Sequence, residues 1–213
     1  MKNEPISATE ALDKLREGNA RFVDGDRCAD TCQGHARLDE HLDGQAPFAI
    51  ILGCSDSRVP VEIVFDVGLG DLFIVRVAGN IVTPALMGSI ELAVEKFGPR
   101  LVVVLGHSGC GAVDLTIQAM KNVDEKTTNH VSSIVERIRP AITEVLAADA
   151  AGDPAALLQD AVRANVCAGV DALLQGSSTL ARYVRDDGLL VVGAEYSLET
   201  GQVEFFAGIP DKG

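Results

Sequence analysis

Long hydrophobic runs are missing from this 213-residue chain, although 47% of its residues are hydrophobic. A membrane-spanning helix needs about 20 consecutive apolar residues, and the longest apolar stretch, Ala46–Cys54, is far shorter. The opening residues MKNEPISATE have no apolar segment behind a basic head, which a secretory signal peptide requires. We therefore expect a cytoplasmic protein without a membrane span.

Basic residues are also scarce, because 18 Lys and Arg face 31 Asp and Glu, for a formal net charge of -13. This balance repels nucleic acid phosphates and anionic membrane surfaces, and no local basic patch offsets it. Nucleic acid and membranes are therefore not expected partners. The mean hydropathy of +0.19 argues against disorder, and the length suits one domain, 1–213, with a full hydrophobic core.

The five cysteines are too few, and odd in number, for a disulfide framework in a cytoplasmic protein. Cys28 and Cys32 have a spacing that zinc sites use, but two further ligands at similar spacing are missing nearby, so a surface loop is the better interpretation. Cys167 lies in a helical stretch rich in Ala and Val, and we expect it in the core.

Continuous apolar runs, rather than alternating ones, indicate the strands. Three of them, Phe48–Gly53, Leu72–Ala78 and Leu101–Gly106, are short and rich in Val and Ile, as buried parallel strands are. Between the second and third, Pro84–Phe97 has apolar residues at helical spacing and ends at a Gly-Pro pair. The pattern predicts a βαβ unit.

The remaining elements complete an α/β fold: a mainly parallel four-stranded sheet with an added antiparallel edge strand, flanked by helices. An N-terminal arm (1–45) carries a helix whose apolar face can pack on its own domain or on a second subunit, and the core is 46–213. The further predicted elements are helices over 7–22, 112–121, 131–148 and 154–184, a parallel strand over 188–194, and an antiparallel strand over 202–207.

Chemically active side chains follow two of the predicted parallel strands. Cys54, Asp56 and Arg58 come after the first, and His107 and Cys110 come after the third. Because the carboxyl ends of parallel strands meet at one edge of the sheet, these loops can converge. Two thiolates and one imidazole supply three ligands to a tetrahedral zinc ion and leave one position open, as in catalytic zinc sites.

The carboxylate of Asp56 has two possible roles. It can be a fourth zinc ligand that closes the site, or it can stay off the metal while the planar guanidinium of Arg58 holds both of its oxygens. In the second case the carboxylate orients a nucleophile.

The two motifs, Cys54-x-Asp56-x-Arg58 and His107-x-x-Cys110, together resemble the paired signature of the β-class carbonic anhydrases. The resemblance implies Zn²⁺ held by the two cysteines and the histidine. It also implies reversible hydration of CO2 to bicarbonate and a proton (a carbonate dehydratase, or lyase), by zinc-bound hydroxide that the Asp–Arg dyad orients. It further implies a homodimer or higher homo-oligomer, with the N-terminal helix packed on a partner subunit.

The resemblance also implies a substrate site. The Gln45 amide and the Gly111 backbone N–H are its expected hydrogen-bond donors, and Phe73, Ala78 and Leu92 are candidate apolar walls for CO2. Leu92 stands where many plant-type members carry Tyr, and Ala78 where a larger Val is common. The pocket is therefore expected to be roomier or more apolar.

Three other functions compete with this interpretation. A cysteine phosphatase needs five residues between its Cys and Arg, whereas three separate Cys54 from Arg58. A hydrolase of carbonyl sulfide or carbon disulfide could use the same fold and zinc ligands. A scaffold protein with zinc closed by Asp56 would have no use for Arg58 or Gln45, because a structural zinc needs only four ligands.

Overall fold

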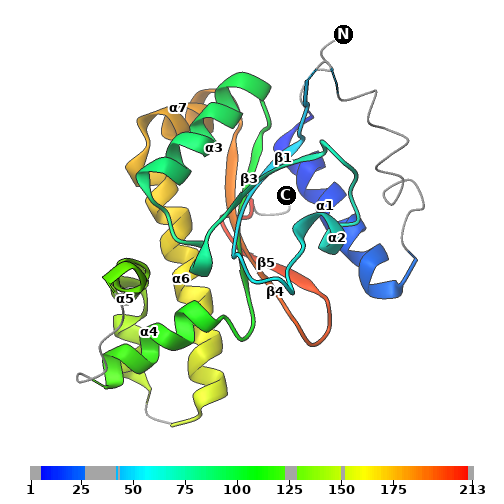
Figure 1. The fold of residues 1–213 in the computed structure, drawn as a ribbon. Helices are drawn as coiled ribbons and strands as arrows, with labels where there is room; N and C mark the ends of the chain where they lie inside the picture. The colour runs from blue at the N-terminus through cyan, green and yellow to red at the C-terminus, as the bar shows by residue number, and fades with distance from the viewer. Residues whose placement is uncertain (1–5, 27–41, 43, 123–128, 150–151, 211–213) are drawn as a thin grey trace.

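The structure is a computed structural model, and it describes residues 6–26, 42, 44–122, 129–149 and 152–210. A five-stranded sheet, in the order β2-β1-β3-β4-β5, runs through the centre with helices on both faces (Figure 1). The first four strands along the chain pair in parallel, and β5 pairs antiparallel with β4. The predicted α/β class with its antiparallel edge strand is confirmed.

The elements have the following bounds. The strands are β1 (Ala49–Gly53), β2 (Leu72–Arg76), β3 (Leu101–His107), β4 (Leu190–Tyr196) and β5 (Val203–Ala207). The helices are α1 (Ala8–Asp24), α2 (Val61–Val64), the 3-10 helix η3 (Ala78–Asn80), α3 (Pro84–Phe97), α4 (Gly111–Lys121), α5 (Asn129–Ala148), α6 (Pro154–Gly176) and α7 (Ser178–Asp186).

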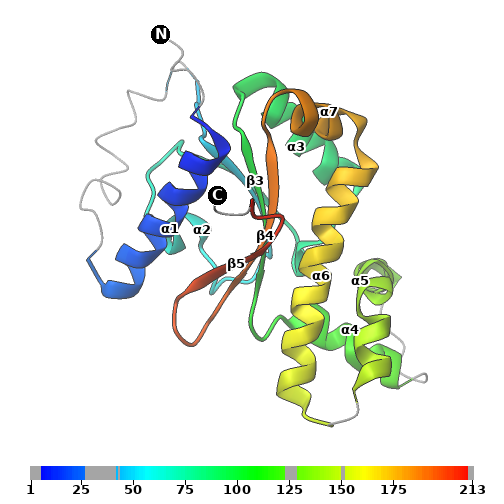
Figure 2. The same ribbon diagram turned by 180° about the vertical axis from the view of Figure 1, so that it is seen from behind.

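Every residue of β1 and β3 is buried, which explains why their apolar runs are continuous. One core cluster fills the space between the sheet and α1 with α2, and a second lies between the other face and α3, α6 and α7 (Figure 2). A third cluster joins α4, α5 and α6 to the carboxyl end of the sheet. Among the described residues, no helix is both long and apolar enough to cross a membrane.

Helix α1 packs on its own chain. Its capping box is present, since the Ser7 hydroxyl accepts from the Glu10 N–H and the Glu10 side chain accepts from the Ser7 N–H. Leu12 and Leu15 lie in the core cluster on the sheet, and Asn19 hydrogen-bonds to backbone groups of α2 and β5. The buried side of the helix therefore lies on its own sheet, and packing of its remaining surface on a partner subunit stays a prediction, because contacts within one chain do not test it.

The structure differs from the sequence predictions at several points. The helix predicted over 154–184 is two helices, because the buried Ser177 interrupts it and caps α7 by accepting from the Leu180 N–H. The second strand ends at Arg76 rather than Ala78, where the chain turns into η3. The four-residue α2 was not predicted, and the Cys28–Cys32 pair lies outside the described residues. The expectation that Cys167 lies in the core is wrong, because the residue is on the exposed side of α6.

Candidate metal centre

The structure brings Cys54, His107 and Cys110 together at the carboxyl edge of the sheet. Cys54 follows β1, His107 ends β3, and Cys110 precedes the first turn of α4. One ligand atom from each residue lies within 4.8 Å of the others. The three residues are 5%, 0% and 1% exposed, respectively, so the cluster is shielded from bulk water.

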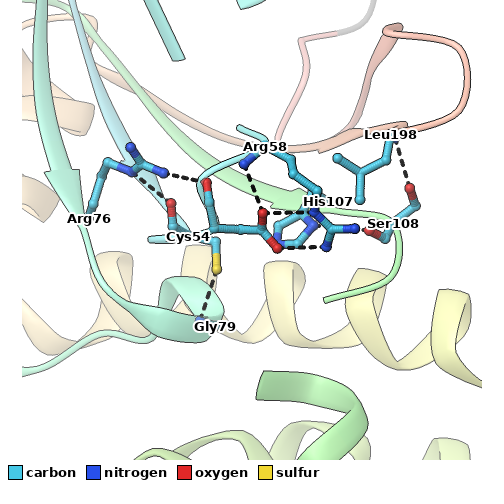
Figure 3. Close-up of polar contacts among 8 residues, drawn as sticks. Cys54, Arg58, Arg76, Gly79, His107, Ser108 and Leu198 are labelled. Atoms are coloured by element: carbon cyan, nitrogen blue, oxygen red, sulfur yellow. Dashed lines mark hydrogen bonds and ion pairs between the residues drawn. The ribbon is translucent and has the colours of Figure 1, made fainter. Parts of the chain in front are cut away.

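The chain turns sharply between His107 and Cys110, and β4 with its following loop fixes that turn. The Ser108 N–H donates to the Tyr196 carbonyl, and the Ser108 hydroxyl accepts from the Leu198 N–H (Figure 3). Gly109 adopts a φ of 65°, in the left-handed region that favours glycine. The turn therefore brings the side chains of His107 and Cys110 into the same cluster.

The imidazole of His107 presents a free nitrogen to the cluster. Its Nδ1 lies 3.0 Å from the Ser108 carbonyl oxygen. Because a carbonyl only accepts, Nδ1 carries the proton and Nε2 has the lone pair. Nε2 is buried and has no hydrogen-bond partner among the described residues. An unpaired buried polar group costs about 1–3 kcal/mol, and a metal ion would use this lone pair.

The two thiols of the cluster influence each other's ionisation. The hydrogen bond between them lowers the pKa of Cys54 and raises the pKa of Cys110. The Gly79 N–H also donates to Cys54 Sγ, at 3.4 Å. Both hydrogen bonds favour the thiolate of Cys54, and thiolates are the form in which cysteine binds zinc.

Asp56 is held beside the cluster by Arg58. Its Oδ1 accepts from Arg58 Nε at 3.0 Å and its Oδ2 accepts from Nη2 at 2.7 Å. These bonds hold the pKa of the Asp56 carboxyl well below its usual range, so the group stays charged. Oδ2 lies 3.9 Å from His107 Nε2. The carboxylate is therefore adjacent to the cluster but engaged by the guanidinium.

Arg76 fixes the loop that carries Cys54 and Asp56. Its Nε donates to the Cys54 carbonyl and its Nη2 to the Asp56 carbonyl, both at 2.7 Å (Figure 3). The sequence left its role open, although an arginine in an otherwise apolar strand was a signal. Its function here is to position the loop.

Two of the expected substrate residues lie beside the cluster in the same chain. Gly111, the first residue of α4, directly follows Cys110. Ala78, the first residue of η3, directly precedes Gly79, whose N–H reaches the Cys54 sulfur.

The other three substrate residues do not approach the cluster within one chain. Gln45 is exposed and lies before β1, at the amino end of the sheet. Phe73 pairs with Ile50 near the amino ends of β2 and β1. Leu92 is on α3 and 54% exposed. If these side chains contribute to a site at this edge, they do so from another copy of the chain.

Comparisons with known proteins agree with the geometry. A family model described as carbonic anhydrase matches residues 49–203. The carbonic anhydrase of Mycolicibacterium smegmatis is 38% identical over 211 residues, which cover 98% of this chain and 97% of the relative. Carbonic anhydrase 2 of Mycobacterium tuberculosis is 37% identical over 198 residues, covering 93% and 91%.

Solved structures of similar fold are also carbonic anhydrases. The Coccomyxa β-carbonic anhydrase in complex with acetazolamide has a TM-score of 0.71 and 26% identity, covering 92% of this chain and 86% of the other. A tetrameric β-carbonic anhydrase of Sordaria macrospora has a TM-score of 0.74 at 23% identity, covering 92% and 97%, which supports the fold alone. The chain belongs to the β-class of the carbonic anhydrase family.

Proposed function

We propose that this protein is a zinc-dependent carbonic anhydrase, which interconverts CO2 with bicarbonate and a proton. The observation that carries the proposal is the buried cluster of Cys54, His107 and Cys110 with the Asp56–Arg58 pair beside it. Relatives named carbonic anhydrase match nearly the whole chain, which supports the same reaction here.

The donor set fits zinc. Two sulfurs and one imidazole nitrogen are ligands that Zn²⁺ accepts in tetrahedral geometry. Tetrahedral zinc with Zn–S bonds of about 2.3 Å separates its two sulfurs by roughly 3.8 Å, and the three ligand atoms here lie within 4.8 Å of one another. The unpartnered Nε2 of His107 supplies the nitrogen. Three protein ligands leave a fourth position for water, as in catalytic zinc sites.

When bound, zinc lowers the pKa of a coordinated water toward about 7. Asp56 is the hydrogen-bond acceptor at that position, since its depressed pKa keeps it a carboxylate. Arg58 fixes the direction of both carboxylate oxygens, which favours orientation of the nucleophile over direct binding to the metal. We therefore propose an open site.

Gly111 is proposed to bind an oxygen of bicarbonate. The backbone N–H groups in the first turn of a helix have no partner within the helix, and the positive end of the helix dipole favours an anion. Gly111 is the first residue of α4 and follows the ligand Cys110 directly. Ala78, which directly precedes Gly79, is proposed as an apolar wall for CO2.

We propose a homo-oligomer in which a second copy supplies Gln45, Phe73 and Leu92. Strand β1 separates Gln45 from the cluster of its own chain, and a five-residue strand is roughly 15 Å long. Strand β2 is an edge of the sheet, so a second copy can approach there. The Sordaria neighbour, which shares this fold, is itself tetrameric.

We also propose a reducing compartment, the cytoplasm. Cys54 and Cys110 are free thiols close enough to hydrogen-bond, and they must stay reduced to bind zinc.

The activity is tested by mass spectrometry of ¹⁸O loss from labelled CO2 at chemical equilibrium, with protein of known zinc content. We expect ¹⁸O loss that requires zinc. Zinc at full occupancy without exchange would contradict the proposal. In that case, turnover of carbonyl sulfide or carbon disulfide would identify the hydrolase, and no turnover at all would indicate a closed structural site.

A further inference from the structure

The short helix η3 touches the metal cluster through its backbone. The Gly79 N–H donates to Cys54 Sγ at 3.4 Å, and both groups are buried (Figure 3). Other backbone bonds hold the entry to this turn: the Val77 N–H donates to the Gly53 carbonyl and the Asn80 N–H donates to the Val77 carbonyl. The backbone conformation at Gly79 therefore decides whether the Cys54 sulfur keeps this N–H donor.

Gly79 has no side chain that could fix its backbone by packing or by a hydrogen bond. Its φ is 71°, and an added Cβ would lie 2.8 Å from Ile138 Cδ1 and 3.1 Å from Ala112 Cβ. The turn thus needs glycine, which is the residue with the greatest backbone freedom. A hydrogen bond that fixes this turn has to come from another part of the fold.

Asn165 of α6 provides that hydrogen bond. Its Nδ2 donates to the Gly79 carbonyl oxygen at 2.9 Å, in a bond buried on both sides. The orientation of the amide follows from chemistry, since a carbonyl oxygen can only accept. Gly169, one turn further along α6, lets the helix lie close to β3, because a Cβ there would be only 3.0 Å from Val104 Cγ1.

Packing alone does not account for an asparagine at this position. The residue is 5% exposed and lies on the buried side of α6 between Val162 and Val166, where it also lines a cavity with Ser133 of α5. A buried amide costs free energy unless it is hydrogen-bonded. Among the described residues, the hydrogen bond that Asn165 makes goes to Gly79. The amide is therefore directed at the turn that donates to the metal-site sulfur.

We propose that Asn165 is a positioning residue of the metal centre: by holding the Gly79 carbonyl, it keeps the Gly79 N–H on the sulfur of Cys54. The inference rests on the proposed zinc site. A hydrogen bond to a ligating thiolate orients it and withdraws negative charge from it, and loss of such outer partners costs about 10–100-fold in metal affinity or activity. Asn165 itself does not touch the metal or the substrate.

The first test uses the unmutated protein loaded with ¹¹³Cd²⁺, which binds thiolates and is visible by NMR. We expect a ¹¹³Cd resonance coupled, across the N–H···S hydrogen bond, to the amide proton of Gly79. A thiolate-bound ¹¹³Cd signal without that coupling would overturn this inference and leave the metal site intact. Failure of Cd²⁺ to bind the cysteines at all would contradict the proposed metal site itself.

The second test is Asn165→Leu, which keeps the number of side-chain atoms and removes the donor. We expect zinc affinity to fall about 10-fold, the Gly79 coupling to weaken, and the thiolate-to-metal charge-transfer band of the Co²⁺ form to move to lower energy. The control Val170→Ala trims a buried side chain on the same helix, away from η3. It should lower stability and leave all three readouts unchanged.

If Asn165→Leu leaves zinc affinity, the Gly79 coupling and the Co²⁺ spectrum unchanged, as the control does, Asn165 is a purely structural residue. If the leucine variant does not fold, Asn165→Asp replaces the donor by an acceptor at constant shape and is expected to weaken zinc binding as well. Unchanged zinc affinity and an unchanged Co²⁺ spectrum in the folded aspartate variant would equally overturn the proposal.

Discussion

The substitution Gly79→Ala isolates the backbone geometry beside the metal cluster. Alanine at a φ of 71° is in the left-handed region, which costs about 1–2 kcal/mol for a residue with a Cβ. The new Cβ would also lie 2.8 Å from Cδ1 of the fully buried Ile138, and overpacking costs about 1–3 kcal/mol. We expect the free energy of unfolding to fall by about 2–5 kcal/mol in total.

The matched control is Gly88→Ala. Gly88 lies inside α3, and an added Cβ there meets nothing within 4 Å. Alanine in a helix interior is more stable than glycine by about 0.5–1 kcal/mol. The same chemical change is therefore expected to have opposite signs at the two positions. Urea unfolding of the metal-free variants measures both, and equal effects at the two sites would refute the reasoning from backbone geometry and space.

The remaining predictions concern the metal centre. Cys54→Ala, His107→Ala and Cys110→Ala should each lose zinc and activity together; elemental analysis checks this, and full zinc occupancy in any variant would remove that residue from the ligand set. Asp56→Asn should keep zinc but lower the hydration rate about 10–100-fold, and an unchanged rate would contradict the role of the carboxylate. The pKa of Asp56 is lower in the folded state than in the unfolded state, so its carboxylate stabilises the fold fully above the unfolded pKa of about 3.9, and this stabilisation is lost as the pH falls toward the folded pKa. The free energy of unfolding of Asp56→Asn should therefore depend less on pH in the acid range. The same pH dependence in the variant and the unmutated protein would contradict this. Zinc at about 1,000 times its Kd should stabilise the fold by about 4 kcal/mol, so a chelator should lower the Tm, and an unchanged Tm would contradict metal binding.

The sheet could be predicted because its signal is local. The runs that become β1 and β3 are apolar at every position, since both faces of these strands are buried. The loops that follow them carry the two motifs, and the parallel arrangement places both at one edge. The meeting of Cys54 with His107 follows from these facts without knowledge of side-chain contacts.

Features that depend on contacts distant in sequence could not be predicted. Arg76 donates to the Cys54 carbonyl and Asn165 to the Gly79 carbonyl. The sequence marks Arg76 as a charged residue in an apolar strand, but no residue pattern identifies a backbone carbonyl as the partner of either side chain. The break between α6 and α7 depends on Ser177, whose buried hydroxyl caps α7 and donates to Glu91 on α3. Gln45 and Cys54 lie at opposite ends of β1, and the extended strand between them keeps them apart within one chain.

The packing of α1 shows a different limit. Its amphipathic pattern predicted a helix with a capping box, and both are present. The pattern identifies an apolar face but not the surface that covers it. The structure assigns that surface to the chain's own sheet through Leu12 and Leu15.

Stopped-flow measurement of CO2 hydration during titration of metal-free protein with Zn²⁺ tests most directly whether the cluster is a catalytic zinc site. Activity is expected to rise linearly with added zinc and to reach its plateau at about one ion per chain, because three ligands from a single chain would hold each ion. Full zinc binding without hydration, or hydration that does not depend on zinc, would contradict this assignment.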